Sequence, residues 1–122
     1  MSGAHGLGEL EAEIMTVMWD NEHPATVRDV LAALERDAAY TTVMTVMDNL
    51  HRKGLLTRER FGKAFHYRPV WSREEYTARL MRDVLAASDN HEAVFTHFVS
   101  QMSAEEARSL QAVWRRHTRH GT

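Results

Sequence analysis

The chain of 122 residues contains no cysteine, which excludes disulfide bonds and thiolate metal sites. It also has no long apolar run. The longest stretch without a charged residue or histidine covers ten residues, 38–47, about half of the ~20 that span a bilayer. The N-terminus "MSGAHGLGELEAE" is acidic and has no hydrophobic signal region. These absences predict a cytoplasmic protein.

The signatures of common enzymes are missing as well. There is no glycine-rich phosphate loop, no nucleophile elbow and no pair of carboxylates in an apolar setting, so we expect no enzyme. Glu9, Glu11 and Glu13 form a polar run that we expect to be solvated surface. The eight histidines are scattered, and because a metal needs converging ligands, we expect neither a metal site nor a cofactor.

Charge is distributed unevenly along the chain. The formal net charge is only −2, but residues 1–38 hold 2 basic and 8 acidic side chains, a net charge of −6. Residues 39–70 hold 6 basic and 2 acidic side chains, a net charge of +4, and residues 71–122 hold 7 of each sign. A local basic segment of this kind indicates a polyanionic partner for residues 39–70.

The periodicity of apolar residues predicts three helices, a β-hairpin and three more helices. The predicted ranges are helices over 7–20, 27–36 and 40–53, a hairpin over 55–69, and helices over 72–87, 91–101 and 103–117. Thr26 with Asp29 forms a predicted capping box, and Gly62-Lys63 supplies a two-residue type II′ turn. Two further capping boxes are predicted for Ser72 with Glu75 and for Ser103 with Glu106. The fold class is therefore mainly α with a small β-hairpin.

The two halves differ in how they can fold. Residues 1–70 can close around one core, whereas residues 71–122 form a segment too small to be stable alone. The second half nevertheless carries large apolar side chains, which we expect to form a dimer interface with a second copy. The alternative is that these helices pack back on the first half. The predicted dimerisation residues are Tyr76, Leu80, Met81, Val84, Phe95, Phe98, Leu110 and Trp114.

The predicted helix over 40–53 has an unusual polar face. Val43, Met47 and Leu50 fall on one side, while Thr41 and Thr45 fall opposite them. Threonine is a mediocre helix former, and capping explains a threonine only at the helix start. Threonine, asparagine and arginine can bind phosphates and base edges, so we expect this helix to read DNA and the hairpin to act as a wing; a merely solvated face is the alternative. The predicted DNA-binding residues are Thr41, Thr42, Thr45, Asn49, Arg52, Lys53, Arg58, Arg60 and Lys63.

The segment "TVMTVMDNLHRKGLL" followed by "FGKAFHYRPV" resembles the BlaI/MecI/CopY family of bacterial winged-helix repressors. The resemblance implies a homodimer that binds inverted-repeat operators and represses genes, often for β-lactam resistance, with a winged helix-turn-helix domain over 1–70 and a three-helix dimerisation domain over 71–122. In the penicillinase branch, a membrane sensor metalloprotease triggers cleavage of the repressor. The cleaved junction resembles His97–Phe98 here, although His97 replaces the usual asparagine.

The sequence leaves two other uses open. A winged helix can bind protein instead of DNA, and a DNA-binding regulator can sense a small ligand. The copper-responsive branch of the family is excluded, because its cysteine-rich tail is absent. Asp48 and Asn49 depart from the residues that are common in the family at these positions, so the operator sequence is not implied.

Overall fold

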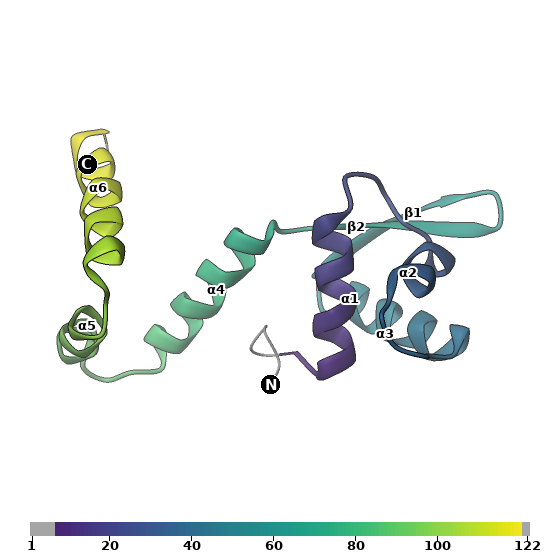
Figure 1. Ribbon diagram of the computed structural model, residues 1–122, viewed down its shortest axis with the longest axis horizontal. Helices are drawn as coiled ribbons and strands as arrows, with labels where there is room; N and C mark the ends of the chain where they lie inside the picture. Colours follow the sequence, from purple (N-terminus) through teal and green to yellow (C-terminus); the bar gives the residue numbers. More distant parts are fainter. Residues whose placement is uncertain (1–6, 121–122) are drawn as a thin grey trace. The chain divides into compact units, whose positions relative to one another are not determined.

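The computed structural model describes residues 7–120 and divides into two compact units, the first ending at Met81 and the second beginning at Arg82 (Figure 1). The described residues form six helices and one two-stranded antiparallel sheet, which confirms the predicted fold class. The elements are α1 (Glu9–Asp20), α2 (Val27–Ala33), α3 (Tyr40–Arg52), β1 (Leu56–Phe61), β2 (Ala64–Pro69), α4 (Arg73–Ala86), α5 (His91–Ser100) and α6 (Ala104–His120). Within this range, no helix is long and apolar enough to cross a membrane.

The first unit has one hydrophobic core, built by α1, α2, α3 and the base of the hairpin. Helix α1 contacts α2, α3 and β2, so its buried face is wider than a single stripe. For this reason Met15 is fully buried, although the stripe that helical periodicity predicts for this helix, Leu10, Ile14, Val17 and Met18, does not include it. The core residues are Ile14, Met15, Met18, Ala25, Val27, Val30, Val43, Met47, Leu50, Leu56 and Tyr67.

Local signals set most of the element ends. The Thr26 hydroxyl accepts a hydrogen bond from the Asp29 N–H at 3.1 Å, and the Asp29 carboxylate accepts one from the Thr26 N–H at 3.0 Å, which confirms the predicted capping box. Gly54 ends α3 at a φ of +86°, where a side chain would be strained. Helix α6 continues past its predicted end at residue 117, because no glycine or proline interrupts it before Gly121.

The hairpin pairs Leu56 with Pro69 at its base and Phe61 with Ala64 at its tip, and Gly62 takes a φ of +62° in the turn between them. The expected Gly-Lys turn is therefore present. Leu56 and Tyr67 are buried at the base. The backbone of Tyr67 also pairs with Ala25 through two hydrogen bonds of 2.8 and 2.9 Å, which fixes β2 to the loop before α2.

Helix α4 begins in the first unit. Its predicted capping box is present, since the Ser72 hydroxyl accepts from the Glu75 N–H at 3.0 Å. Trp19 of α1 donates its indole N–H to the Trp71 carbonyl at 2.9 Å, and its ring lies 5.7 Å from the ring of Tyr76. The first compact unit therefore extends past residue 70, and a functional boundary at that residue stays a prediction.

The second unit contains the end of α4, α5 and α6. The capping box of Ser103 and Glu106 opens α6, as predicted. Of the side chains described from Arg82 onward, none is buried. A stable helical unit normally encloses apolar side chains, so this part of the chain lacks a core of its own among its described residues.

Candidate nucleic-acid interface

The polar face of α3 is open to solvent, as the helical wheel predicts. Thr41, Thr42 and Thr45 are exposed and Asn49 is half-buried, whereas Val43, Met47 and Leu50 on the opposite face are fully buried. The α3 backbone is helical from Tyr40, so Thr45 projects from the second turn and has no capping role. Side chains with hydroxyl and amide groups thus line the accessible side of a helix whose other side is fixed in the core.

The cations at the end of α3 are both paired with acids. Arg52 is 73% exposed and lies 2.5 Å from Asp48, one turn earlier in the same helix. Lys53 caps the helix and donates to the Glu11 carboxylate of α1 at 2.8 Å. The Lys53 side chain is therefore about half exposed and bound to another helix. The Arg52 side chain remains mostly exposed despite its ion pair.

The expectation that Glu9, Glu11 and Glu13 are solvated is wrong for Glu11 and incomplete for the other two. The Glu11 side chain is only 15% exposed, because α1 packs beside the end of α3. Burial acts to raise the pKa of Glu11, but hydrogen bonds from Lys53 and from the Gly8 N–H outweigh it, so the pKa lies below its usual value. Glu9 and Glu13 both pair with Arg36, at 3.3 and 2.6 Å.

The wing carries two cations at its tip, Arg60 and Lys63, and two nearer its base, Arg58 and the exposed Arg68. Arg60 and Lys63 are exposed, and neither forms an ion pair with another residue of the described range. Arg58 is only 23% exposed and donates to both the Asp48 carboxylate and the Tyr67 hydroxyl. The nine predicted DNA-binding residues therefore all lie on α3, its C-cap or the wing, and a direct DNA contact by each stays a prediction.

Three residues of this surface were missed by the sequence analysis. Arg28 of α2 lies over the ring of Tyr40, the first residue of α3, with 5.6 Å between the guanidinium carbon and the ring centroid. Met44 is an exposed apolar residue beside Thr41 and Thr45. The sequence contained one indication of Arg28, because it is one of only two Lys or Arg residues in the acidic segment 1–38.

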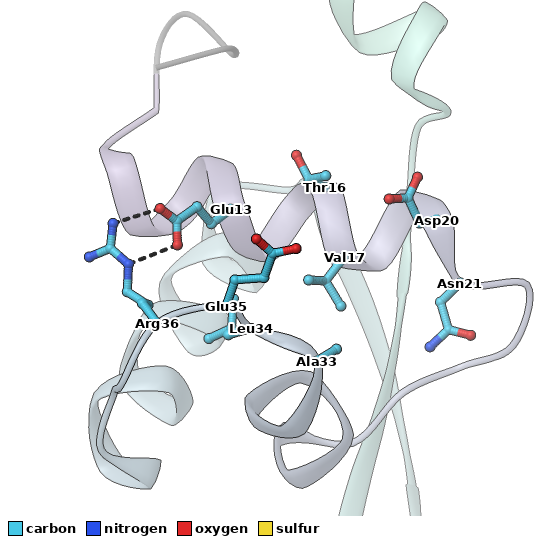
Figure 2. A pocket seen from close by; sticks show the side chains of 9 residues that line it. All are labelled: Glu13, Thr16, Val17, Asp20, Asn21, Ala33, Leu34, Glu35 and Arg36. Atoms are coloured by element: carbon cyan, nitrogen blue, oxygen red, sulfur yellow. Dashed lines mark hydrogen bonds and ion pairs between the residues drawn. The ribbon is translucent and has the colours of Figure 1, made fainter. Parts of the chain in front are cut away.

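A groove between α1 and the end of α2 has the opposite charge. Figure 2 shows the carboxylates of Glu13, Asp20 and Glu35 around it, with Val17 among the apolar residues that line it. Its single cation, Arg36, is already bound to Glu13 by two hydrogen bonds of 2.8 and 2.6 Å. A surface with this excess of acid repels phosphates, so this groove is an unfavourable site for a polyanion, unlike the basic tip of the wing.

The second unit exposes most of the predicted dimerisation residues. Val84 is 74% exposed and Trp114 is 68% exposed, and Phe98 lines two open grooves along α5 and α6. Two predicted residues differ from the rest: Leu80 is half-buried, and Tyr76 is half-buried beside Trp19 in the first unit. The other exposed members of the set are Phe95 and Leu110 of the second unit and Met81, the last residue of the first.

Comparisons with known proteins identify the family. The family model described as penicillinase repressor matches residues 7–116. The transcriptional regulator BlaI from two strains of Mycobacterium tuberculosis, CDC 1551 / Oshkosh and ATCC 25618 / H37Rv, is 43% identical over 110 residues, covering 86% of this chain and 80% of each relative.

A solved structure is similar in outline. The crystal structure of MepR, a transcription regulator of the Staphylococcus aureus multidrug efflux pump MepA, aligns with a TM-score of 0.49 and 18% identity, over 91% of this chain and 77% of that one. The family match and the mycobacterial relatives confirm the predicted resemblance: this chain belongs to the penicillinase repressor family, a family of transcriptional repressors and not of enzymes.

Proposed function

We propose that this protein is a homodimeric repressor that binds inverted-repeat operator DNA, with α3 in the major groove and the wing beside it. The observation that carries the proposal is the exposed face of α3, where Thr41, Thr45 and Arg52 stand on a helix that is anchored in the core and joined to the wing by an ion pair. Hydroxyl groups and arginine bind phosphate oxygens, and asparagine can bind adenine through two hydrogen bonds. Asn49 is therefore the proposed base reader.

The proposal assigns dimerisation to α4, α5 and α6. Its support is the absence of buried side chains among the residues described after Arg82, together with the exposure of Val84, Phe98 and Trp114. Burial of apolar surface is the main favourable term in association, and the core of a homodimer interface is more apolar than the rest of a protein surface. A second copy that packs its own α4, α5 and α6 against these helices would supply the missing core.

Footprinting of the full chain on genomic DNA tests the proposal. Two reading helices on one face of the duplex would protect two half-sites centred about 10 bp apart, or a multiple of this. A symmetric pair of protected half-sites is the expected result. A complete lack of protection at low salt would contradict DNA binding and favour a protein-interaction module instead.

A salt titration of the bound DNA locates the surface that meets phosphate. Replacing Arg60 or Lys63 by alanine should each lower the slope of log affinity against log salt by about 1, because each residue neutralises one phosphate. Arg108→Ala on α6 is the matched control, since it removes an exposed cation of the second unit. Equal slopes for all three variants and the parent protein would remove the wing tip as a phosphate contact.

Relief of repression by proteolysis is a separate part of the proposal, and it comes from the resemblance to the penicillinase branch and its membrane sensor metalloprotease. The corresponding junction, His97–Phe98, lies inside α5 (His91–Ser100). A protease binds an extended segment, so α5 would have to unwind locally before cleavage. Mass spectrometry of the protein from cells treated with a β-lactam should detect a fragment that ends at His97, and an intact chain in induced cells would contradict this step.

A further inference from the structure

Asp48 lies on the exposed side of α3, where an acid would repel the phosphates of bound DNA. Two guanidinium groups hold its carboxylate. Oδ1 accepts from Arg58 of the wing at 2.9 Å, and Oδ2 accepts from Arg52 of α3 at 2.5 Å. The hydrogen bond from Arg58, followed by that from Arg52, lowers the pKa of Asp48, so the residue stays ionised and paired.

Arg58 extends this contact into the wing and the core. The nitrogen that bonds Asp48 also donates to the Tyr67 hydroxyl at 3.2 Å. Its guanidinium carbon lies 4.1 Å from the centroid of the Phe65 ring, a cation–π contact on the same face of the hairpin. Tyr67 is 2% exposed and its backbone is bonded to Ala25. A continuous set of contacts therefore joins α3, both strands and the core.

The outer part of the hairpin has little else to hold it. Every residue from Glu59 to Phe65 is exposed, and a two-stranded hairpin is only marginally stable by itself. Leu56 and Tyr67 fix the base of the hairpin in the core. Among the side-chain hydrogen bonds of the described residues, the one from Arg58 to Asp48 is the outermost that connects the wing to α3.

We infer that Asp48 is a positioning residue, which fixes the angle between the wing and the reading helix through Arg58 and thereby determines operator specificity without touching DNA. The inference rests on the proposed function, because it presupposes that α3 and the wing bind the same DNA. A preorganised pair of elements loses less conformational freedom when both must fit one operator. Non-specific binding depends on charge and needs no fixed angle.

For Asp48→Ala, positioning and simple electrostatics predict opposite changes in the affinity for the operator. Asp48→Ala removes a negative charge near DNA, so electrostatics alone predicts tighter binding to every sequence. Positioning by Asp48 predicts instead that the affinity for the operator falls, by roughly 3- to 30-fold, the usual range for coupled neighbouring residues. The affinity for an unrelated duplex of equal length should stay level or rise up to about twofold, since only charge acts there.

Glu59→Ala is the matched control, because Glu59 is an exposed acid of the wing with no ion pair to another described residue. It should tighten binding slightly and equally on both duplexes. Anisotropy titrations of the full chain give the two affinities of each variant. Parallel changes on the operator and the unrelated duplex for Asp48→Ala, in either direction, would overturn the inference. A parent protein that gives no operator footprint would overturn the proposed function instead.

A measurement without DNA tests the contact itself. Arg58→Lys keeps the positive charge but shortens the side chain and removes the planar guanidinium, whose Nη1 bonds both Asp48 and Tyr67 and whose carbon lies over the Phe65 ring. Nuclear magnetic resonance relaxation of the amides over residues 59–65 should show greater mobility in Asp48→Ala and in Arg58→Lys than in the parent, and no further increase in the double variant. Additive increases, or unchanged mobility in both single variants, would show that the pair does not position the wing.

Discussion

Trp114 offers the most direct test of the dimer. It is 68% exposed on α6, and among the described residues nothing from its own chain covers most of its ring. A tryptophan buries on the order of 150–250 Å² when fully enclosed, so roughly 100–170 Å² is available to a partner. At ~25 cal/mol per Å², this area is worth roughly 2.5–4 kcal/mol for each copy.

A symmetric dimer contains the residue twice. If half of the available area is buried, the two copies together contribute about 2.5–4 kcal/mol, which corresponds to a dissociation constant raised about 100- to 1000-fold in Trp114→Ala. Trp114→Phe is the matched control, since it retains most of the apolar area and should raise the constant far less. Sedimentation velocity over a concentration series measures both constants.

Circular dichroism at a concentration where the parent is dimeric checks that α6 still forms, because an exposed tryptophan supports little of the helix itself. The reasoning is refuted if Trp114→Ala dimerises as tightly as the parent. The helices of the second unit would then use another surface, and the exposure of Trp114 would have no part in assembly.

Four further predictions concern the first unit. Arg52→Ala should weaken binding to every DNA sequence and lower the salt slope by about 1, measured by anisotropy at several salt concentrations, and an unchanged slope would argue against a phosphate contact. Asn49→Ala should alter base preference more than non-specific affinity, which selection from a randomised duplex pool would detect; an equal loss on all sequences would remove it as a reader. Thr26→Ala should lower the free energy of unfolding by about 1 kcal/mol in urea titrations, because the cap of α2 is lost. The Thr26 hydrogen bonds lower the pKa of Asp29, so its contribution to stability is fully present above pH ~4 and is lost as the pH falls through the folded pKa. Asp29→Asn should therefore destabilise the protein at pH 7, and the difference from the parent should shrink as the pH falls below ~4.

Several elements were predictable because their causes are local. The capping boxes of Thr26, Ser72 and Ser103 act over three residues, and each forms as expected. Gly54 and Gly62 take positive φ where the chain must end a helix or turn between strands. The polar face of α3 follows from the period of 3.6 residues, so Thr41 and Thr45 were placed on the exposed side correctly.

Asp48 and Arg52 are one turn apart in α3, but the pairing of charged side chains on different elements was not predictable from the sequence. Lys53 and Glu11 are separated by 42 positions, and only the packing of α1 against α3 brings them together. Arg58 was expected to reach DNA from the wing, yet the structure also gives it Asp48 and Tyr67 as partners. The alternation of a strand shows which face a side chain occupies, but it does not show what lies opposite that face.

The sequence alone determined the order of the elements, their caps and turns, the basic segment over residues 39–70 and the apolar surface of the second half, because each depends on neighbours within one or two helical turns. Only the tertiary structure decided that Lys53 is bound to Glu11 and Arg58 to Asp48, while other cations of the segment remain available to a polyanion. The physical reason is that an ion pair needs two side chains within about 4 Å, and the distance between remote residues is set by how helices and strands pack rather than by their own patterns.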